Sequence, residues 1–336
     1  MTANVQGITH TGDDVLSRIR EMGFAGIYRK YGTILVFAGI FLLASLLNET
    51  FLTTGNLTNV LRQVVVISLL ACGVHFVITL GHIDVSLGSV VALTGTIAAS
   101  VMAMTQNLYL ALAAGIAVGI LVGVINGFVV TYFKIPSFIM TLAMTTVARG
   151  AILLYTAGVP ISNLGDDFQI IGQDNIGPIP ISVLILFVVI LVSWALLHRT
   201  RFGRHVYAVG GNAKAAVASG INSDSVIRKA FIFNGILAAI AGIVLMSRIN
   251  SGQPAAGVGY EFDAITAVVV GGTSLMGGTG SIMGTVIGSM IIGVINNILN
   301  LMNVSSYWQQ IIKGLIIAVA VILDVKTKSA GKGKKA

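Results

Sequence analysis

The chain has 336 residues, of which 55% are hydrophobic and only 10% charged, and its mean hydropathy is +0.93. This composition excludes an ordinary soluble domain and is typical of a protein that crosses the membrane many times. The formal net charge of +8 would suggest nucleic acid in a soluble protein, but in a membrane protein basic residues usually mark cytoplasmic segments. We therefore expect lipid, and no nucleic acid, as a partner.

Residues 1–30 are polar and carry Arg18, Arg20, Arg29 and Lys30. No hydrophobic core with a cleavage site precedes the first apolar run, so we expect that run to be retained as a span. The stretch TGDD at 11–14, followed by apolar residues at helical spacing, is typical of a short amphipathic helix on the membrane surface. We expect residues 1–30 to form a cytoplasmic tail.

Ten apolar segments approach the length of about 20 residues that a transmembrane helix requires. They are 31–47, 59–80, 86–104, 108–133, 136–157, 181–197, 229–249, 262–276, 281–302 and 306–324. The eighth is the weakest, because it is short and ends in a cluster of glycines at 271–280. Whether it forms a continuous helix stays open at this point.

The basic residues decide the topology. The polar segment 198–229 contains six lysines and arginines, and the tail 325–336 is rich in lysine, whereas the segments between spans on the other side carry acidic residues such as Asp166 and Asp167. By the positive-inside rule both basic segments are cytoplasmic, which requires that the eighth segment crosses. The prediction is an all-α membrane domain over 31–324 with ten transmembrane helices and both termini in the cytoplasm.

Glycines recur every four residues along two of the predicted spans. Such ridges allow close helix packing in lipid, and a sliding surface is the alternative. The glycines are Gly115, Gly119, Gly123 and Gly127 in the fourth span and Gly280, Gly284 and Gly288 at the start of the ninth.

Motifs for chemistry are missing from the sequence. No GxxxxGK[ST] loop and no HExxH motif occurs, so we expect no enzyme activity, no ATP binding and no metal site in this chain. No carboxylate falls deep within a predicted span, which argues against a proton- or sodium-coupled carrier. The polar groups near span ends are candidates for a pathway, gate or docking contact: Asp84, Ser86, Arg248, Glu261 and Asp263.

The segment 198–229 interrupts the apolar pattern and predicts a short cytoplasmic helix. Asn212 is a good N-cap, Ala213–Ser219 favour helix, and Gly220 suits the left-handed residue that closes one, while Gly210 and Gly211 are expected to turn the chain. Its methyl side chains carry no catalytic chemistry but suit a protein groove; a basic loop on anionic lipid is the alternative. The expected contact residues are Asn212, Ala213, Lys214, Ala215, Ala216, Ser219 and Gly220. Tyr207 stays unexplained.

The stretch KAAVASG at 214–220 resembles the coupling-loop signature of ABC importer permeases. Further segments resemble the ribose-type sugar permeases, the branch that includes xylose, galactoside, allose, inositol and autoinducer permeases: GHIDVSLGSVVALTG (81–95), IPSFIMTLAM (135–144), the basic stretch 199–222, the glycine-rich stretch 251–288 and SSYWQQIIKG (305–314). The resemblance covers about 33–324. Val85, Leu87 and Phe262 depart conservatively from the usual residues.

The resemblance implies a bacterial inner-membrane permease, paired with a second copy, that takes up a ribose-like monosaccharide or polyol. It implies a cytoplasmic ATPase subunit that holds ATP and magnesium and contacts residues 212–220, and a periplasmic sugar-binding protein that docks on 158–180 and 250–262. No cofactor is expected in this chain itself. An ion-coupled secondary carrier or a channel that acts without an ATPase stays the alternative.

Overall fold

A computed structural model describes residues 23–332, and most of this range is helical. The amphipathic helix predicted near the N-terminus lies outside the described residues. The long helices are α2 (Gly23–Leu47), α3 (Thr54–Thr79), α4 (Leu87–Thr105), α5 (Leu108–Tyr132), α6 (Ser137–Thr156), α8 (Ile181–Arg199), α11 (Ser223–Ile249), α13 (Ile282–Leu301) and α14 (Ser306–Lys332). The short elements are η1 (Glu49–Leu52), α7 (Asp166–Gln173), β1 (Asn175–Ile176), β2 (Ile179–Pro180), α9 (Arg201–Gly211), α10 (Ala213–Ala218) and α12 (Tyr260–Val270).

Seven of the described helices, α3, α4, α5, α6, α8, α11 and α13, are long and apolar enough to cross a membrane. Shorter apolar stretches occupy Gly32–Leu47 of α2 and Ser306–Ile322 of α14. These nine helices coincide with nine of the ten predicted spans, because a run of about 20 apolar residues is a strong and local signal. The remaining predicted span corresponds to α12.

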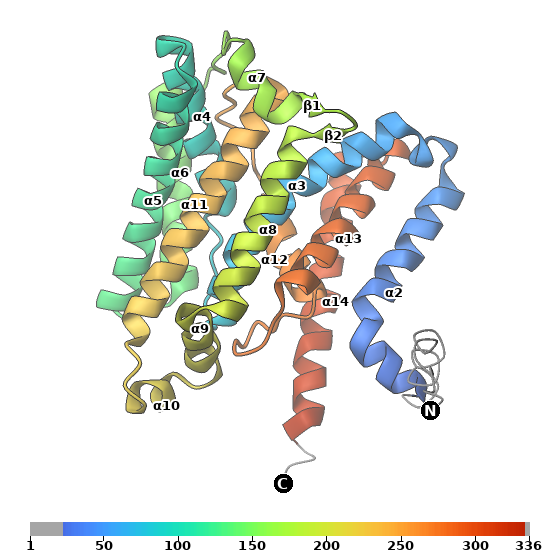
Figure 1. Cartoon of the computed structure of the whole chain (residues 1–336), viewed down its shortest axis with the longest axis vertical. Helices are drawn as coiled ribbons and strands as arrows, with labels where there is room; N and C mark the ends of the chain where they lie inside the picture. The colour runs from blue at the N-terminus through green and yellow to red at the C-terminus, as the bar shows by residue number, and fades with distance from the viewer. Residues whose placement is uncertain (1–22, 333–336) are drawn as a thin grey trace, which may run out of the picture.

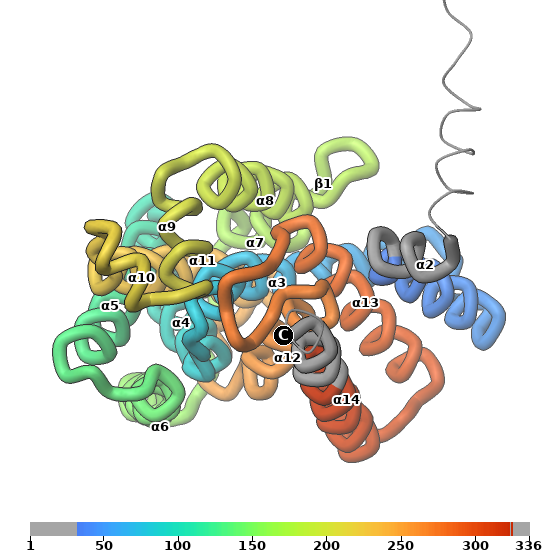
Figure 2. The backbone as a smooth tube through the Cα atoms, turned by 90° about the horizontal axis from the view of Figure 1, so that it is seen from below, coloured from blue at the N-terminus to red at the C-terminus, as the bar shows by residue number. Residues whose placement is uncertain are grey.

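The helices form a bundle with α11 and α3 at its centre. α11 packs against α3, α4 and α5, and the residues of α3 from Val64 to Thr79 are all buried. Seen from one end, the other helices surround this pair, with α14 and α2 on the side of α12 and α13 (Figure 2). α5, α6 and α8 turn apolar side chains outward, as Leu154 on α6 illustrates with 86% exposure. Such faces suit lipid.

The two ends of the bundle differ (Figure 1). α9 and α10 lie at one end, together with the first turns of α2 and the last turns of α14, and we call this the α10 end. α7 and the two-stranded hairpin lie at the opposite end, which we call the α7 end. The structure therefore brings both ends of its described chain to the same side.

The structure answers the question left open for 262–276: the helix in this segment, α12, ends at Val270. α12 has 11 residues, or about 16 Å at 1.5 Å per residue, against a hydrocarbon core of about 30 Å. The irregular segments 250–259 and 271–281 flank α12: Gly252 bridges to Ile161 on one side, and on the other the Gly278 amide donates to the Thr79 carbonyl (2.8 Å). Non-helical backbone is tolerated at this depth where protein buries it.

The glycine ridge of α5 faces α11. A Cβ at Gly119 would meet the backbone of Gly235, and one at Gly127 would lie 3.0 Å from the Arg228 Cα. Gly123 faces the same helix, whereas Gly115 lies between α4 and α11, with atoms of Ala98, Thr94 and Ile243 at 3.1 Å from an added Cβ. Gly119 and Gly123 have room only for glycine, because backbone oxygens of α11 lie within 2.5 Å of an added Cβ at these positions.

The glycines of α13 face the segment before it. Gly284 and Gly288 lie against Gly271 and Ala267, at the end of α12, and Gly280 lies against Thr273 and His75. The close approach holds the half-length helix α12 against α13.

Candidate functional site

α10 is a six-residue helix held by its caps. The Asn212 side chain accepts a hydrogen bond from the Ala215 amide (3.0 Å), and Gly220 adopts φ +83° just after the helix. A helix this short is not stable alone. Ala216 anchors it, because its side chain is only 5% exposed and belongs to the main apolar core.

The burial of Ala216 corrects its predicted role: this methyl group faces the protein itself and not a partner. The outward face of α10 carries Ala213, Lys214 and Val217, and Val217 is 57% exposed. The sequence reasoning missed Val217. The helical period was the signal that could have found it, since positions 213, 214 and 217 share one face of a helix. Ala215, Ser219 and Gly220 are exposed as well.

α9 extends through the two glycines that were expected to turn the chain. Thr200 caps its start by accepting a hydrogen bond from the Gly203 amide (3.2 Å), and the turn follows at Asn212. Gly210 packs directly on the backbone of Thr79, at the end of α3, and of Gly278. Gly211 has nothing within 4 Å of an added Cβ. The first glycine is thus required by a contact and the second is not.

Tyr207 has a clear structural role. Its hydroxyl donates a hydrogen bond to the carbonyl of Gly280 (2.8 Å), in the segment that joins α12 to α13. Burial raises the pKa of the Tyr207 hydroxyl further above neutral pH, at which this group is protonated in any case and can donate. Together with Gly210, Tyr207 connects the α9–α10 segment to the interior of the bundle.

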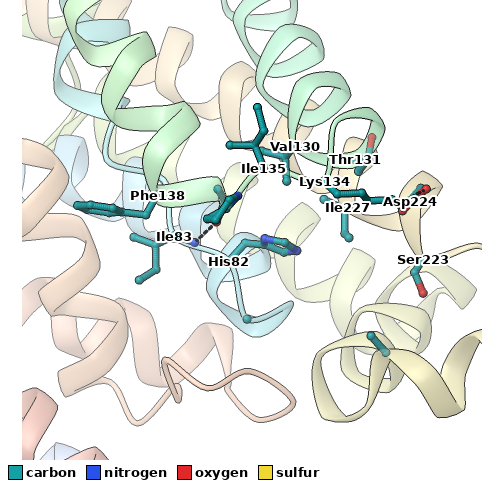
Figure 3. A pocket seen from close by; sticks show the side chains of 14 residues that line it. His82, Ile83, Val130, Thr131, Lys134, Ile135, Phe138, Ser223, Asp224 and Ile227 are labelled. Atoms are coloured by element: carbon teal, nitrogen blue, oxygen red, sulfur yellow. Dashed lines mark hydrogen bonds and ion pairs between the residues drawn. The ribbon is translucent and has the colours of Figure 1, made fainter.

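A pocket of about 560 Å³ lies beside α10 (Figure 3). Its walls come from the segment after α3, the connection between α5 and α6, and the start of α11. At its rim Lys134 forms an ion pair with Asp224 (2.8 Å), and His82 projects from the segment after α3. A partner that docks on Ala213 would also reach this opening, since Ala213 is part of the lining.

Asp84 lies inside the bundle, 3% exposed. One oxygen accepts from the amide (2.8 Å) and the hydroxyl (2.6 Å) of Ser86, and the other accepts from Asn234 of α11 (2.8 Å). Asp84 lies between two predicted spans, as expected, but the irregular segment 80–86 that carries it is buried inside the bundle. These hydrogen bonds tie the start of α4 to α11.

The other predicted polar residues lie toward the α7 end. Asp263 is buried and accepts from Lys313 of α14 (2.8 Å) and Asn296 of α13 (3.3 Å). Glu261, two residues earlier in the first turn of α12, lines a groove of about 530 Å³ between α12 and α14. Arg248 lies in the last turn of α11, where its carbonyl accepts from Gln173 (3.1 Å). Within the described residues, no three metal-binding side chains come together.

Known proteins similar to this chain are membrane permeases. The family profile described as "Branched-chain amino acid transport system / permease component" matches residues 56–321. The chain is 46% identical to the ribose import permease protein RbsC of Bacillus subtilis (strain 168), over 93% of this chain and 97% of that protein. It is 37% identical to the L-arabinose transport system permease protein AraH of Escherichia coli (strain K12), over 90% and 93%. No solved structure matches.

Proposed function

The chain belongs to this permease family, and on that premise we propose that it is the membrane-spanning subunit of an ATP-driven importer for a monosaccharide or related polyol. One observation carries the proposal: a ribose import permease shares 46% of its residues with this chain along nearly the whole length of both. An L-arabinose and a D-allose permease match over similarly long ranges. The substrate class is therefore a small sugar.

We place the α10 end in the cytoplasm. The segment 198–229 at this end carries Arg199, Arg201, Arg204, Lys214, Arg228 and Lys229, whereas α7 at the other end begins with Asp166 and Asp167. The positive-inside rule favours this orientation. With α12 and its two irregular flanks counted as one crossing, the chain spans the inner membrane ten times and both termini are cytoplasmic.

The ATPase subunit, which holds ATP and magnesium, docks on the outward face of α10 and the pocket beside it. Movement of α10 is passed to α9 and then, through Gly210 and the Tyr207 hydrogen bond, to the end of α3 and to segment 271–281. The 271–281 segment ends the half-length helix α12. These elements take two arrangements, and the ATPase binds one of them more tightly when ATP is bound. This difference in affinity couples ATP binding to transport.

A sugar-binding protein docks at the α7 end, on residues 158–180 and 250–262, and a second copy of the permease completes the passage. Residues 161 and 252 form a bridge there, so the two docking segments are joined to one another. Alternating access then follows from the coupled movement of the two permeases.

Reconstitution distinguishes this proposal from a secondary carrier or a channel. The chain is co-expressed with its ATPase, purified as a complex, and assayed for ATP hydrolysis with binding protein loaded with ribose, arabinose or allose. We expect one loaded binding protein to stimulate hydrolysis. A chain that binds no ATPase and takes up sugar by itself would refute the proposal.

A further inference from the structure

Two irregular segments flank α12, and each is held by a charged side chain from another helix. Arg149 of α6 contacts segment 250–259, and Asp324 of α14 contacts segment 271–281. Backbone that is not helical needs hydrogen-bond partners within a membrane protein, because lipid offers none. These two side chains supply such partners on opposite sides of α12.

Arg149 holds the segment toward the α7 end. Its guanidinium donates to the carbonyls of Pro254 (2.6 Å) and Ala256 (2.9 Å). Charged side chains within membrane helices are rare and usually functional. Directly after these carbonyls, Gly257 (φ +76°) and Gly259 (φ +85°) lead into α12, and glycine turns at such positions without steric cost. Arg149 thus fixes a segment that its glycines leave free to turn.

The same segment is joined to the surface proposed for the binding protein. Gly252 and Ile161 exchange backbone hydrogen bonds of 2.8 and 3.0 Å. A partner that docks on residues 158–180 would therefore pull on segment 250–259 through this bridge. The contact of Arg149 with Pro254 and Ala256 is what such a pull has to break.

Asp324 holds the segment toward the α10 end. One carboxylate oxygen accepts from the Ser274 hydroxyl and from the Leu275 amide, both at 3.2 Å. Asp324 lies about 27 Å along α14 from the start of that helix, so this contact is far from the α7 end. The Tyr207 hydroxyl of α9 binds the same segment. Segment 271–281 is therefore held jointly by α14 and by α9, which leads to α10.

We propose that Arg149 and Asp324 are the positioning residues of two gates. Segment 250–259 closes the outer end of the sugar's path while Arg149 holds it, and segment 271–281 closes the inner end while Asp324 holds it. Both contacts are formed in the structure, so both gates are closed. Docking of the loaded binding protein releases the outer contact and movement of α9 releases the inner one, never both together. The inference rests on the proposed function and adds the residues that control each end of the path.

Single cysteines report on each gate in the complete complex. Cys72 is the only cysteine of the chain, so Cys72→Ala provides a cysteine-free parent. Ala99→Cys lies beneath the outer segment, since Ala99 is buried and its Cβ would be 2.9 Å from a Cβ added to Gly252. Thr79→Cys lies beneath the inner segment, since Thr79 is buried and its carbonyl accepts from the Gly278 amide (2.8 Å).

The complex is embedded in nanodiscs, where both ends are open to solvent, and labelled with a water-soluble maleimide, which needs a hydrated thiolate. We expect Arg149→Met to speed labelling of Ala99→Cys by about tenfold or more, the factor for one lost hydrogen bond to a charged group, and to leave Thr79→Cys unchanged. Asp324→Ala should do the reverse. Arg149→Lys keeps a donor and Asp324→Asn keeps an acceptor, so both should stay closer to the parent.

Each opposite result has a distinct meaning. Equal acceleration at both cysteines by either variant would show general loosening and overturn the assignment of gates, and so would unchanged rates at both. With Arg149 and Asp324 intact, the loaded binding protein and ATP, added singly and together, should raise one rate at a time; a condition that raises both would overturn the alternation. A parent complex that fails to take up sugar would instead refute the proposed function.

Discussion

Gly210 and Gly211 are adjacent at the end of α9 but differ in what an added methyl group would meet. A Cβ at Gly210 would lie 2.8 Å from the Gly278 amide nitrogen and 2.9 Å from the Thr79 carbonyl carbon, and closer still to the Thr79 oxygen. These are backbone atoms, so relief requires α9, the end of α3 or the 271–281 segment to shift. A Cβ at Gly211 meets nothing within 4 Å. Gly210→Ala and Gly211→Ala are therefore a matched pair.

The difference in unfolding free energy between the two variants isolates the steric effect. Replacing a helical glycine by alanine gains about 0.4–1 kcal/mol where the backbone accepts it, and both variants share this gain. Overpacking a closely packed site costs about 1–3 kcal/mol. We therefore expect Gly210→Ala to be less stable than Gly211→Ala by about 1–3 kcal/mol.

The assay is denaturant unfolding of the purified protein in detergent, followed by helical circular dichroism. ATP hydrolysis by the reconstituted complex is measured in parallel, and we expect sugar-stimulated hydrolysis to fall for Gly210→Ala and to persist for Gly211→Ala. Equal unfolding midpoints for the two variants would refute the docking of α9 on Thr79 and Gly278, and with it the proposed route from α10 into the bundle.

Three further predictions concern single side chains. Val217→Asp should leave the unfolding midpoint unchanged and reduce co-purification of the ATPase. Ala216→Arg places a charge in the core and should lower the unfolding midpoint. A lower midpoint for Val217→Asp than for Ala216→Arg would contradict the assigned faces of α10. Lys313→Met should lower the free energy of unfolding by about 3–5 kcal/mol, because it leaves Asp263 buried without its cation. Lys134→Met, which breaks an exposed ion pair, should lower it by at most about 1 kcal/mol. Equal losses for the two variants would contradict the burial of the Lys313–Asp263 pair. Cys72 should resist maleimide until the protein unfolds, because its thiol is buried, and labelling of the folded protein would show otherwise.

Features that depend on neighbouring residues in the chain could be predicted from the sequence. The caps of α10, Asn212 and Gly220, are local signals, and both act as expected in the structure. The nine long or apolar helices followed from runs of apolar residues. The family was recognised from several long motifs in order, and the match to the permease family confirms it.

Features that depend on contacts between distant parts of the chain could not be predicted from the sequence. α12 ends at Val270, because the chain turns at Gly272 (φ +89°) into a segment that packs against α3 and α9. The number of apolar residues in 262–276 does not predict this turn. The role of Tyr207 follows from its hydrogen bond to Gly280, and the need for glycine at 210 follows from its contact with Thr79. The groove between α12 and α14 is lined by Glu261 and Gln310, which are far apart in the chain, so it is found only from the packing of the two helices.

Sugar uptake into proteoliposomes, with each component omitted in turn, tests the account most directly. The complete set is this chain, the ATPase, the loaded binding protein and ATP. We expect uptake of one monosaccharide or polyol with the complete set and none when the ATPase, the binding protein or ATP is left out. Equal uptake by proteoliposomes that hold this chain alone would contradict the assignment as the permease of an ATP-driven importer.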